Sequence, residues 1–190
     1  PYTWDKERVS SYIRYVDTDN QSHWLFDSFL FLEIMDTGTG GANKMFAKGY
    51  NLESANQADW TKLIDYYFQS ETGIGALDAS VKEASAILGT PRQKRQIVIS
   101  IPEPIVYQHP EQASSSTKYW GKIDNQTLDF SNSADRIKAC KWYIDQVRAK
   151  FNEKNYQHVE LAGFYWLAEK ATDTRDILNA VAIYLNKLKY

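Results

Sequence analysis

The amino-acid sequence predicts an α/β fold of the TIM type, a parallel-stranded (β/α) barrel. Short apolar segments alternate with amphipathic ones, and the amphipathic segments are long enough to be helical crossovers between parallel strands. Four strands can be found, whereas a closed barrel needs eight. Because no strand follows the last helix, we expect residues 1–190 to form a single domain, the N-terminal half of such a barrel. A small open sheet is the alternative.

The first part of the chain contains two predicted strands and two predicted helices. Polar and apolar side chains alternate over residues 9–16, and residues 24–34 hold the longest apolar run, so both segments predict strands. A polar, glycine-rich loop follows at residues 38–41. Apolar residues then recur every three or four positions over residues 60–68 and 74–88, which predicts two helices with one buried face each.

The second part of the chain repeats this alternation. Residues 97–101 form a continuous, mostly β-branched run, which predicts the third strand. A helical stripe of apolar residues covers 133–151, and residues 159–164 predict the fourth strand. The last helix is expected to open at Thr172 or Asp173.

Composition excludes several functional classes. The formal net charge is −2, so there is no electrostatic basis for binding nucleic acid or an anionic membrane. No apolar run approaches the ~20 residues of a membrane span. The sequence shows neither metal-ligand spacing nor a phosphate-binding glycine pattern, so we expect no cofactor. Aromatic residues reach 14%, with 6 Trp and 13 Tyr, which suits carbohydrate-binding surfaces as well as stable cores.

The segment after the fourth strand is the most informative part of the sequence. Tyr165 and Trp166 are followed by Glu169 shortly before the last helix. In α/β folds, ligands bind at the carboxyl ends of parallel strands. Two aromatic planes and a carboxylate at such an end are suited to holding a sugar ring and attacking its glycosidic bond. The alternative is that both aromatic residues belong to the core and that Glu169 is a charge at a helix entry.

Two more carboxylates follow predicted strands, and glycosidic cleavage usually needs two carboxyl groups. We expect Glu169 to be the acid/base, because packing against Tyr165 and Trp166 would disfavour its charged form. Glu33 is the first candidate for the second group and Glu103 the next, unless the second group lies on a strand outside this chain. The simpler alternatives are a salt-bridged strand end for Glu33 and a solvated loop charge for Glu103.

Further candidate substrate-binding residues lie in a strand and in a long loop. Asp27 stands inside an apolar strand, where it either points into the barrel to bind substrate or faces outward and caps a neighbouring backbone. Residues 102–132 form a loop far longer than the usual connection of about 4–6 residues. Tyr107 lies in this loop, as do Tyr119 and Trp120, a pair that either stacks on sugar or anchors the loop to the domain.

Three segments resemble a bacterial family known as the domain of unknown function 4855. They are residues 24–34, 97–104 and 136–170, and the resemblance extends from about residue 9 to residue 190. The most specific parts are LFDSFLFLE in the first segment and LAGFYW in the third. An aromatic residue is usual in the family at the position of Glu103, so this residue departs from the family pattern.

The resemblance implies a TIM-barrel, glycoside-hydrolase-like protein of polysaccharide-degrading bacteria. It implies export, and hence a secreted, periplasmic or cell-surface location, and it implies further strands that would complete the barrel as a partner. We therefore expect a glycoside hydrolase-like protein that acts on an extracellular polysaccharide through two carboxylates. A non-catalytic carbohydrate-binding barrel module is the alternative.

Overall fold

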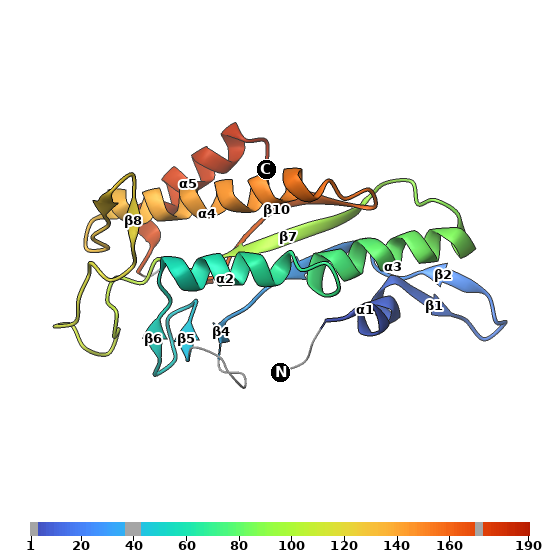
Figure 1. Cartoon of the computed structure of the whole chain (residues 1–190), viewed down its shortest axis with the longest axis horizontal. Helices are drawn as coiled ribbons and strands as arrows, with labels where there is room; N and C mark the ends of the chain where they lie inside the picture. Colours follow the sequence, from blue (N-terminus) through green and yellow to red (C-terminus); the bar gives the residue numbers. More distant parts are fainter. Residues whose placement is uncertain (1–3, 37–42, 170–172) are drawn as a thin grey trace.

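The computed structural model describes residues 4–36, 43–169 and 173–190 (Figure 1). The glycine-rich loop at residues 38–41 and Thr172 lie outside these residues. The helices of the described part are α1 (Lys6–Ile13), α2 (Gln57–Tyr67), α3 (Gly73–Leu88), α4 (Ser133–Lys154) and α5 (Arg175–Lys187). Within the described ranges, no helix has both the length and the apolar composition needed to cross a membrane.

A parallel sheet lies at the centre of the fold. Its strands are, in spatial order, β10 (Val159–Trp166), β7 (Arg95–Ile101) and β3 (Ser28–Phe31). Phe164 and Phe31 both pair with Ile99, so the three strands run in the same direction with their carboxyl ends at one edge. In the view of Figure 1, α2 and α3 follow one another below β7, and α4 runs above it. The carboxyl ends of the strands lie on the left of this view.

Short strands form smaller sheets beside the central one. One antiparallel pair is β1 (Arg14–Val16) with β2 (Ser22–Trp24), and another is β8 (Lys122–Ile123) with β9 (Gln126–Thr127). The strands β4 (Met35–Asp36), β5 (Lys44–Met45) and β6 (Glu53–Ser54) form a mixed sheet. Because β4 follows β3 and β6 precedes α2, this mixed sheet lies beyond the carboxyl end of the central sheet.

The predicted parallel (β/α) barrel, or its N-terminal half, is wrong, whereas the α/β class is confirmed. The described residues contain a parallel sheet of three strands together with antiparallel and mixed sheets. The predicted first strand, residues 9–16, is helical over most of its length. Val9 and Ile13, four residues apart, are both buried in α1, which packs against α3. Asp5 caps this helix, since its carboxylate accepts the backbone N–H of Arg8 at 3.0 Å.

The predicted second strand is also shorter than its apolar run. Pairing with β1 ends at Trp24, and β3 begins at Ser28. Between them, the N–H of Leu25 donates to the carbonyl of Ile13 at 2.9 Å, so the chain here is tied to the end of α1. The apolar run therefore contributes residues to two different sheets. Its apolar character is continuous, so the sequence does not indicate where one strand ends and the next begins.

The helices cover one face of the parallel sheet. Ile99 and Ile101 are 0% and 1% exposed and belong to a core that includes apolar residues of α2, α3 and α4. On the neighbouring strand, Phe29 and Phe31 pack against this core, whereas Leu30 between them is 48% exposed. Successive residues of a strand point to opposite faces. The helices therefore pack on the face that carries these isoleucines and phenylalanines.

An aromatic cluster holds the long loop, residues 102–132, against the helices. Trp120 is 1% exposed, and its ring centroid lies 5.1 Å from that of Trp60 in α2 and 5.6 Å from that of Trp142 in α4. Phe130, also in the loop, stacks on Trp120 at 5.5 Å. Some of the many aromatic residues of the sequence therefore anchor this loop to the helices.

The same loop contains a tight hairpin. Asp124 and Asn125 both have positive φ angles, 52° and 62°, as the two central residues of a type I′ turn require, and they connect β8 to β9. Gly121 lets the loop approach α2 closely, because a Cβ there would lie 2.3 Å from Oε1 of Gln57. That oxygen instead accepts the N–H of Lys122 at 3.0 Å. The loop is therefore built into the domain.

Candidate functional site

Glu103 is a buried carboxyl group at the carboxyl end of β7. The chain runs straight from the strand into this residue, which is 6% exposed. Its N–H donates to the carbonyl of Phe46 at 2.8 Å, and its Oε2 accepts the backbone N–H of Lys48 at 2.6 Å. The segment after β5 thus holds Glu103 at two points.

Burial raises the pKa of Glu103 above its ordinary value, because a buried site disfavours the charged form. The hydrogen bond from the Lys48 N–H acts in the opposite direction, whereas the charge of Asp173 raises the pKa further. The net direction is upward, so Glu103 keeps its proton to higher pH than an exposed glutamate does.

A cavity of about 240 Å³ lies beside Glu103. It is lined by Lys48, Glu103, Pro104, Ile105, Val106, Tyr107, Pro110, Asp173 and Thr174. Its walls come from the segment after β5, from the first part of the long loop and from the start of α5. Apolar side chains and a tyrosine ring thus alternate with a carboxyl group, an ammonium group, a carboxylate and a hydroxyl group.

The start of α5 forms the polar wall of this cavity. Thr174, the N-cap residue of α5, is 1% exposed, and its Oγ1 has no hydrogen-bond partner in the described part of the chain. Asp173 pairs with Nζ of Lys48 at 2.8 Å. Behind this wall, buried Arg136 donates to the Asp173 carbonyl at 3.1 Å and to both carboxylate oxygens of Asp176 at 2.6 and 3.3 Å. The helix start is therefore held by several polar contacts, yet the Thr174 hydroxyl has no partner among the described residues.

Two of the sequence-predicted site residues, Glu103 and Tyr107, lie in this cavity. The backbone carbonyl of Tyr107 accepts the hydroxyl of Ser54 at 2.8 Å, which fixes its position. Tyr119 lies behind the cavity wall, where its hydroxyl donates to the carbonyl of Ile105 and burial raises its pKa. It therefore braces the wall.

Trp120 has no ring face open to a ligand. It is 1% exposed and packs within the aromatic cluster described above. Of the two alternatives for this residue, stacking on sugar and anchoring the loop, its burial fits the second. The reason is local, since the loop folds back and brings Trp120 between α2 and α4.

Glu33 lies at the same edge of the sheet, one strand away from Glu103, but it does not line the cavity. It stands two residues beyond Phe31, the last residue of β3, and is half-buried. Burial raises the pKa of Glu33, and the nearby charge of Asp36 raises it further. Burial also raises the pKa of Tyr66, and the charge of Glu33 raises it further.

The end of β10 is arranged differently from the expectation. The hydroxyl of Tyr165 donates to Oε1 of Glu169, and this hydrogen bond raises the pKa of the tyrosine. Glu169 is exposed, whereas the ring of Trp166 packs against the core. Tyr165 is therefore a hydrogen-bond partner of the carboxylate, where the sequence suggested an apolar wall. None of these residues contributes to the lining of the Glu103 cavity.

Asp27 lies at the opposite end of the sheet. It immediately precedes β3, is exposed, and accepts the hydroxyl of Ser28 at 3.2 Å. Its carbonyl accepts the N–H of Gln96 in β7 at 2.8 Å. This is the position expected for the second alternative, an outward carboxylate at a strand start.

The sequence reasoning missed the cavity residues Lys48 and Thr174 and treated Asp173 only as a helix start. A lysine in a segment with no predicted element gives no signal in a single sequence. The pair Asp173–Thr174 before an amphipathic helix could have been recognised as a polar group at the carboxyl side of a strand. Their convergence on Glu103 depends on tertiary structure alone.

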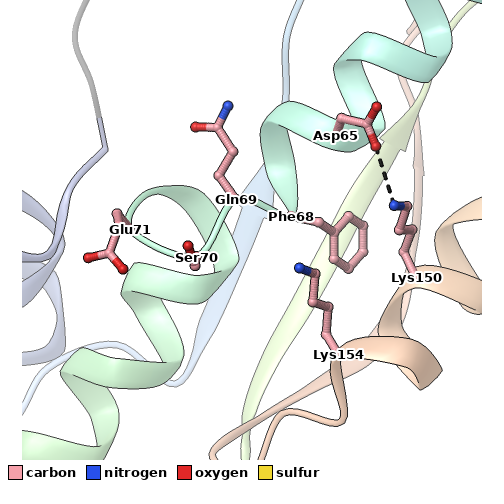
Figure 2. A pocket seen from close by; sticks show the side chains of 7 residues that line it. All are labelled: Asp65, Phe68, Gln69, Ser70, Glu71, Lys150 and Lys154. Atoms are coloured by element: carbon pink, nitrogen blue, oxygen red, sulfur yellow. Dashed lines mark ion pairs between the residues drawn. The ribbon is translucent and has the colours of Figure 1, made fainter.

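A second cavity, of about 410 Å³, lies between the α2–α3 connection and the C-terminal part of α4 (Figure 2). It is lined by Asp65, Phe68, Gln69, Ser70, Glu71, Lys150 and Lys154. Figure 2 shows Lys150 pointing toward Asp65, and the ion pair spans 3.4 Å. This cavity is lined by no sequence-predicted site residue, and its charged groups lie on α2, on α4 and in the α2–α3 connection. We therefore take the Glu103 cavity as the candidate site.

Comparisons with known proteins are sparse. No curated protein and no solved structure matches the chain. The model of one family, described as a domain of unknown function (DUF4855), matches residues 1–190. The chain therefore belongs to the DUF4855 family.

Proposed function

We propose that this protein is a glycoside hydrolase-like enzyme that acts on an extracellular polysaccharide, with Glu103 as its proton donor. The observation that carries the proposal is a buried carboxyl group with a raised pKa beside a cavity at the carboxyl end of a central strand. A general acid must hold its proton at the working pH, and the burial of Glu103 shifts its pKa in that direction. The proposal needs no barrel.

A second carboxylate lines the same cavity. Asp173 is about half exposed and is paired with Lys48, whereas Glu103 is buried. One carboxyl group in a buried site and another in a polar site is the arrangement that separates an acid from a charged partner. Asp173 is therefore the partner that geometry favours, and Glu33, at the neighbouring strand end, is the next candidate.

The remaining lining suits a sugar. Pro104, Ile105 and Pro110 offer apolar surface to the C–H groups of a ring, and Tyr107 adds an aromatic side chain. Thr174 and Lys48 offer hydrogen-bonding groups to hydroxyls. This mixture of apolar walls and few convergent polar groups is typical of small-molecule sites.

The test is hydrolysis of a panel of plant and host polysaccharides by the wild-type chain and by Glu103→Gln, followed as release of reducing ends. We expect the wild type to cleave at least one glycan and the variant to lose roughly 100-fold or more in rate. Binding of the same glycan should persist, because glutamine keeps an oxygen that accepts the Lys48 N–H. Failure of the wild type on every glycan contradicts the enzymatic proposal, and an unchanged variant rate contradicts the role of Glu103.

A non-catalytic carbohydrate-binding role is the second candidate, and one observation favours it. The carboxylate of Asp173 is already paired with Lys48, so the described residues that line the cavity include no second carboxylate free of an ion pair. If the protein only binds carbohydrate, the panel should show glycan binding without any release of reducing ends. Glu103→Gln should then leave both the binding and the absence of cleavage unchanged.

A further inference from the structure

The charges around the Glu103 cavity are already paired. Lys48 contacts Asp173 at 2.8 Å, and the guanidinium of Arg136 contacts both oxygens of Asp176. Each of these cations therefore has a carboxylate partner within the protein. Glu103 adds a further acidic group. An anionic ligand would find no uncommitted cation among these groups and would lie against two carboxyl groups.

An uncharged ligand meets better-matched partners in the same place. Thr174 Oγ1 is buried and has no partner within the described residues, although a buried hydroxyl group normally has one. A ligand hydroxyl can both donate to and accept from the Thr174 hydroxyl, and it can accept from the Lys48 ammonium group.

The size of the cavity limits the ligand to a small unit. Its volume is about 240 Å³. Pockets for drug-sized ligands have roughly 300–1,000 Å³. The cavity is thus too small for a stretch of several sugar rings but suits a single ring.

We propose that this cavity holds one uncharged sugar unit at the end of a glycan chain and that Thr174 and Lys48 bind its hydroxyl groups. The inference rests on the proposed function and goes beyond it, since it separates neutral sugars from uronic acids and chain ends from chain interiors. The apolar residues Ile105 and Pro110 also line the cavity.

The first experiment compares matched pairs of sugars by isothermal titration calorimetry. The probes are the methyl glycosides of glucose and galactose with the corresponding glucuronic and galacturonic acid glycosides, followed by di- and tetrasaccharides of whichever sugar binds. We expect the neutral member of a pair to bind at least about tenfold more tightly than the acid. Lengthening the chain should change the dissociation constant by less than about threefold, because only one unit enters the cavity.

The second experiment tests Thr174. Thr174→Val removes the hydroxyl while keeping the side-chain shape, and Thr61→Val, at an exposed position of α2, is the matched control. Loss of one neutral hydrogen bond should weaken sugar binding roughly fivefold to tenfold. The melting temperature of Thr174→Val should not fall, since the hydroxyl has no partner among the described residues, whereas a purely structural role predicts a lower melting temperature.

The outcomes separate this inference from the proposed function. Tighter binding of a uronic acid, or affinity that rises steeply with chain length, overturns the inference while leaving carbohydrate binding intact. Unchanged binding by Thr174→Val overturns the role of Thr174. Absence of binding to every sugar tested overturns the inference and the proposed function together.

Discussion

The carboxyl ends of β7 and β10 look alike in sequence and differ in structure. Each carries a glutamate, Glu103 after β7 and Glu169 after β10, within reach of aromatic residues. Glu103 is 6% exposed, is held by the segment after β5 and borders a cavity. Glu169 is exposed and accepts a hydrogen bond from Tyr165. The difference teaches that a strand-end carboxylate becomes a candidate acid only when distant segments bury it.

The largest expected effect separates the two glutamates by rate. On any glycan that the wild type cleaves, Glu103→Gln should reduce turnover by roughly 100-fold to 10,000-fold, the range for loss of a general acid. Glu169→Gln is the matched control and should change turnover by less than about threefold. Reducing-end assays on both variants measure this, and the reverse ranking would assign the acid to the end of β10.

The next largest effect concerns the loop that walls the cavity. Trp120→Ala should lower the free energy of unfolding by about 3–5 kcal/mol, because it empties the centre of a buried aromatic cluster. Chemical denaturation measures this loss. Tyr107→Ala is the comparison, since this residue lines the cavity and is only partly buried. It should weaken sugar binding while costing much less stability, and an equal loss from both variants would contradict the division of roles.

A pH dependence of stability should follow from the buried acid. The pKa of Glu103 is raised in the folded state, so the folded protein holds this proton to higher pH than the unfolded chain does. Its contribution to stability is fully present below the unfolded pKa, about 4.3, and is lost as pH rises through the folded value. Glutamine does not ionise, so the Glu103→Gln variant should not show this loss of stability with rising pH.

The corresponding measurement is chemical denaturation of wild type and Glu103→Gln between pH 4 and pH 8. The free energy of unfolding of the variant minus that of the wild type should increase with pH across this window. All other titrating groups are shared, so the difference isolates Glu103. A difference that stays flat, or that decreases, is incompatible with a raised pKa.

The smallest effect is expected at the exposed end of β10. Tyr165→Phe removes the hydroxyl that donates to Glu169. Because the carboxylate is exposed, water replaces the lost hydrogen bond, and we expect the free energy of unfolding to change by no more than about 0.5 kcal/mol. Thermal denaturation checks this value. A loss of several kcal/mol would mean that this end of the sheet is as tightly built as the end of β7.

Much of the element order could be predicted from the sequence. The helical stripes of α2, α3 and α4 and the continuous apolar run of β7 follow from periodicity, and the structure contains all of them. The helix α1 could not be predicted, because only Val9 and Ile13 mark its buried face amid residues that alternate like a strand. That error supplied an extra strand and strengthened the barrel interpretation, which the structure overturns.

The candidate site could be predicted only in part. Glu103 and Tyr107 follow a recognisable strand, so their place at the edge of the sheet could be inferred from the chain alone. Lys48 lies 55 residues away from Glu103, and its N–H reaches the carboxylate through the packing of the mixed sheet. Whether Glu103 is buried or solvated depends on that packing, and no local pattern of residues encodes it.

The most direct test of the central claim is an NMR titration of the Glu103 side-chain carboxyl carbon in the wild-type chain, assigned by its absence in Glu103→Gln. We predict a pKa above the ordinary glutamate value of about 4.3. A pKa at or below that value would mean that Glu103 loses its proton as readily as an exposed glutamate, and the assignment of the acid at the end of β7 would be wrong.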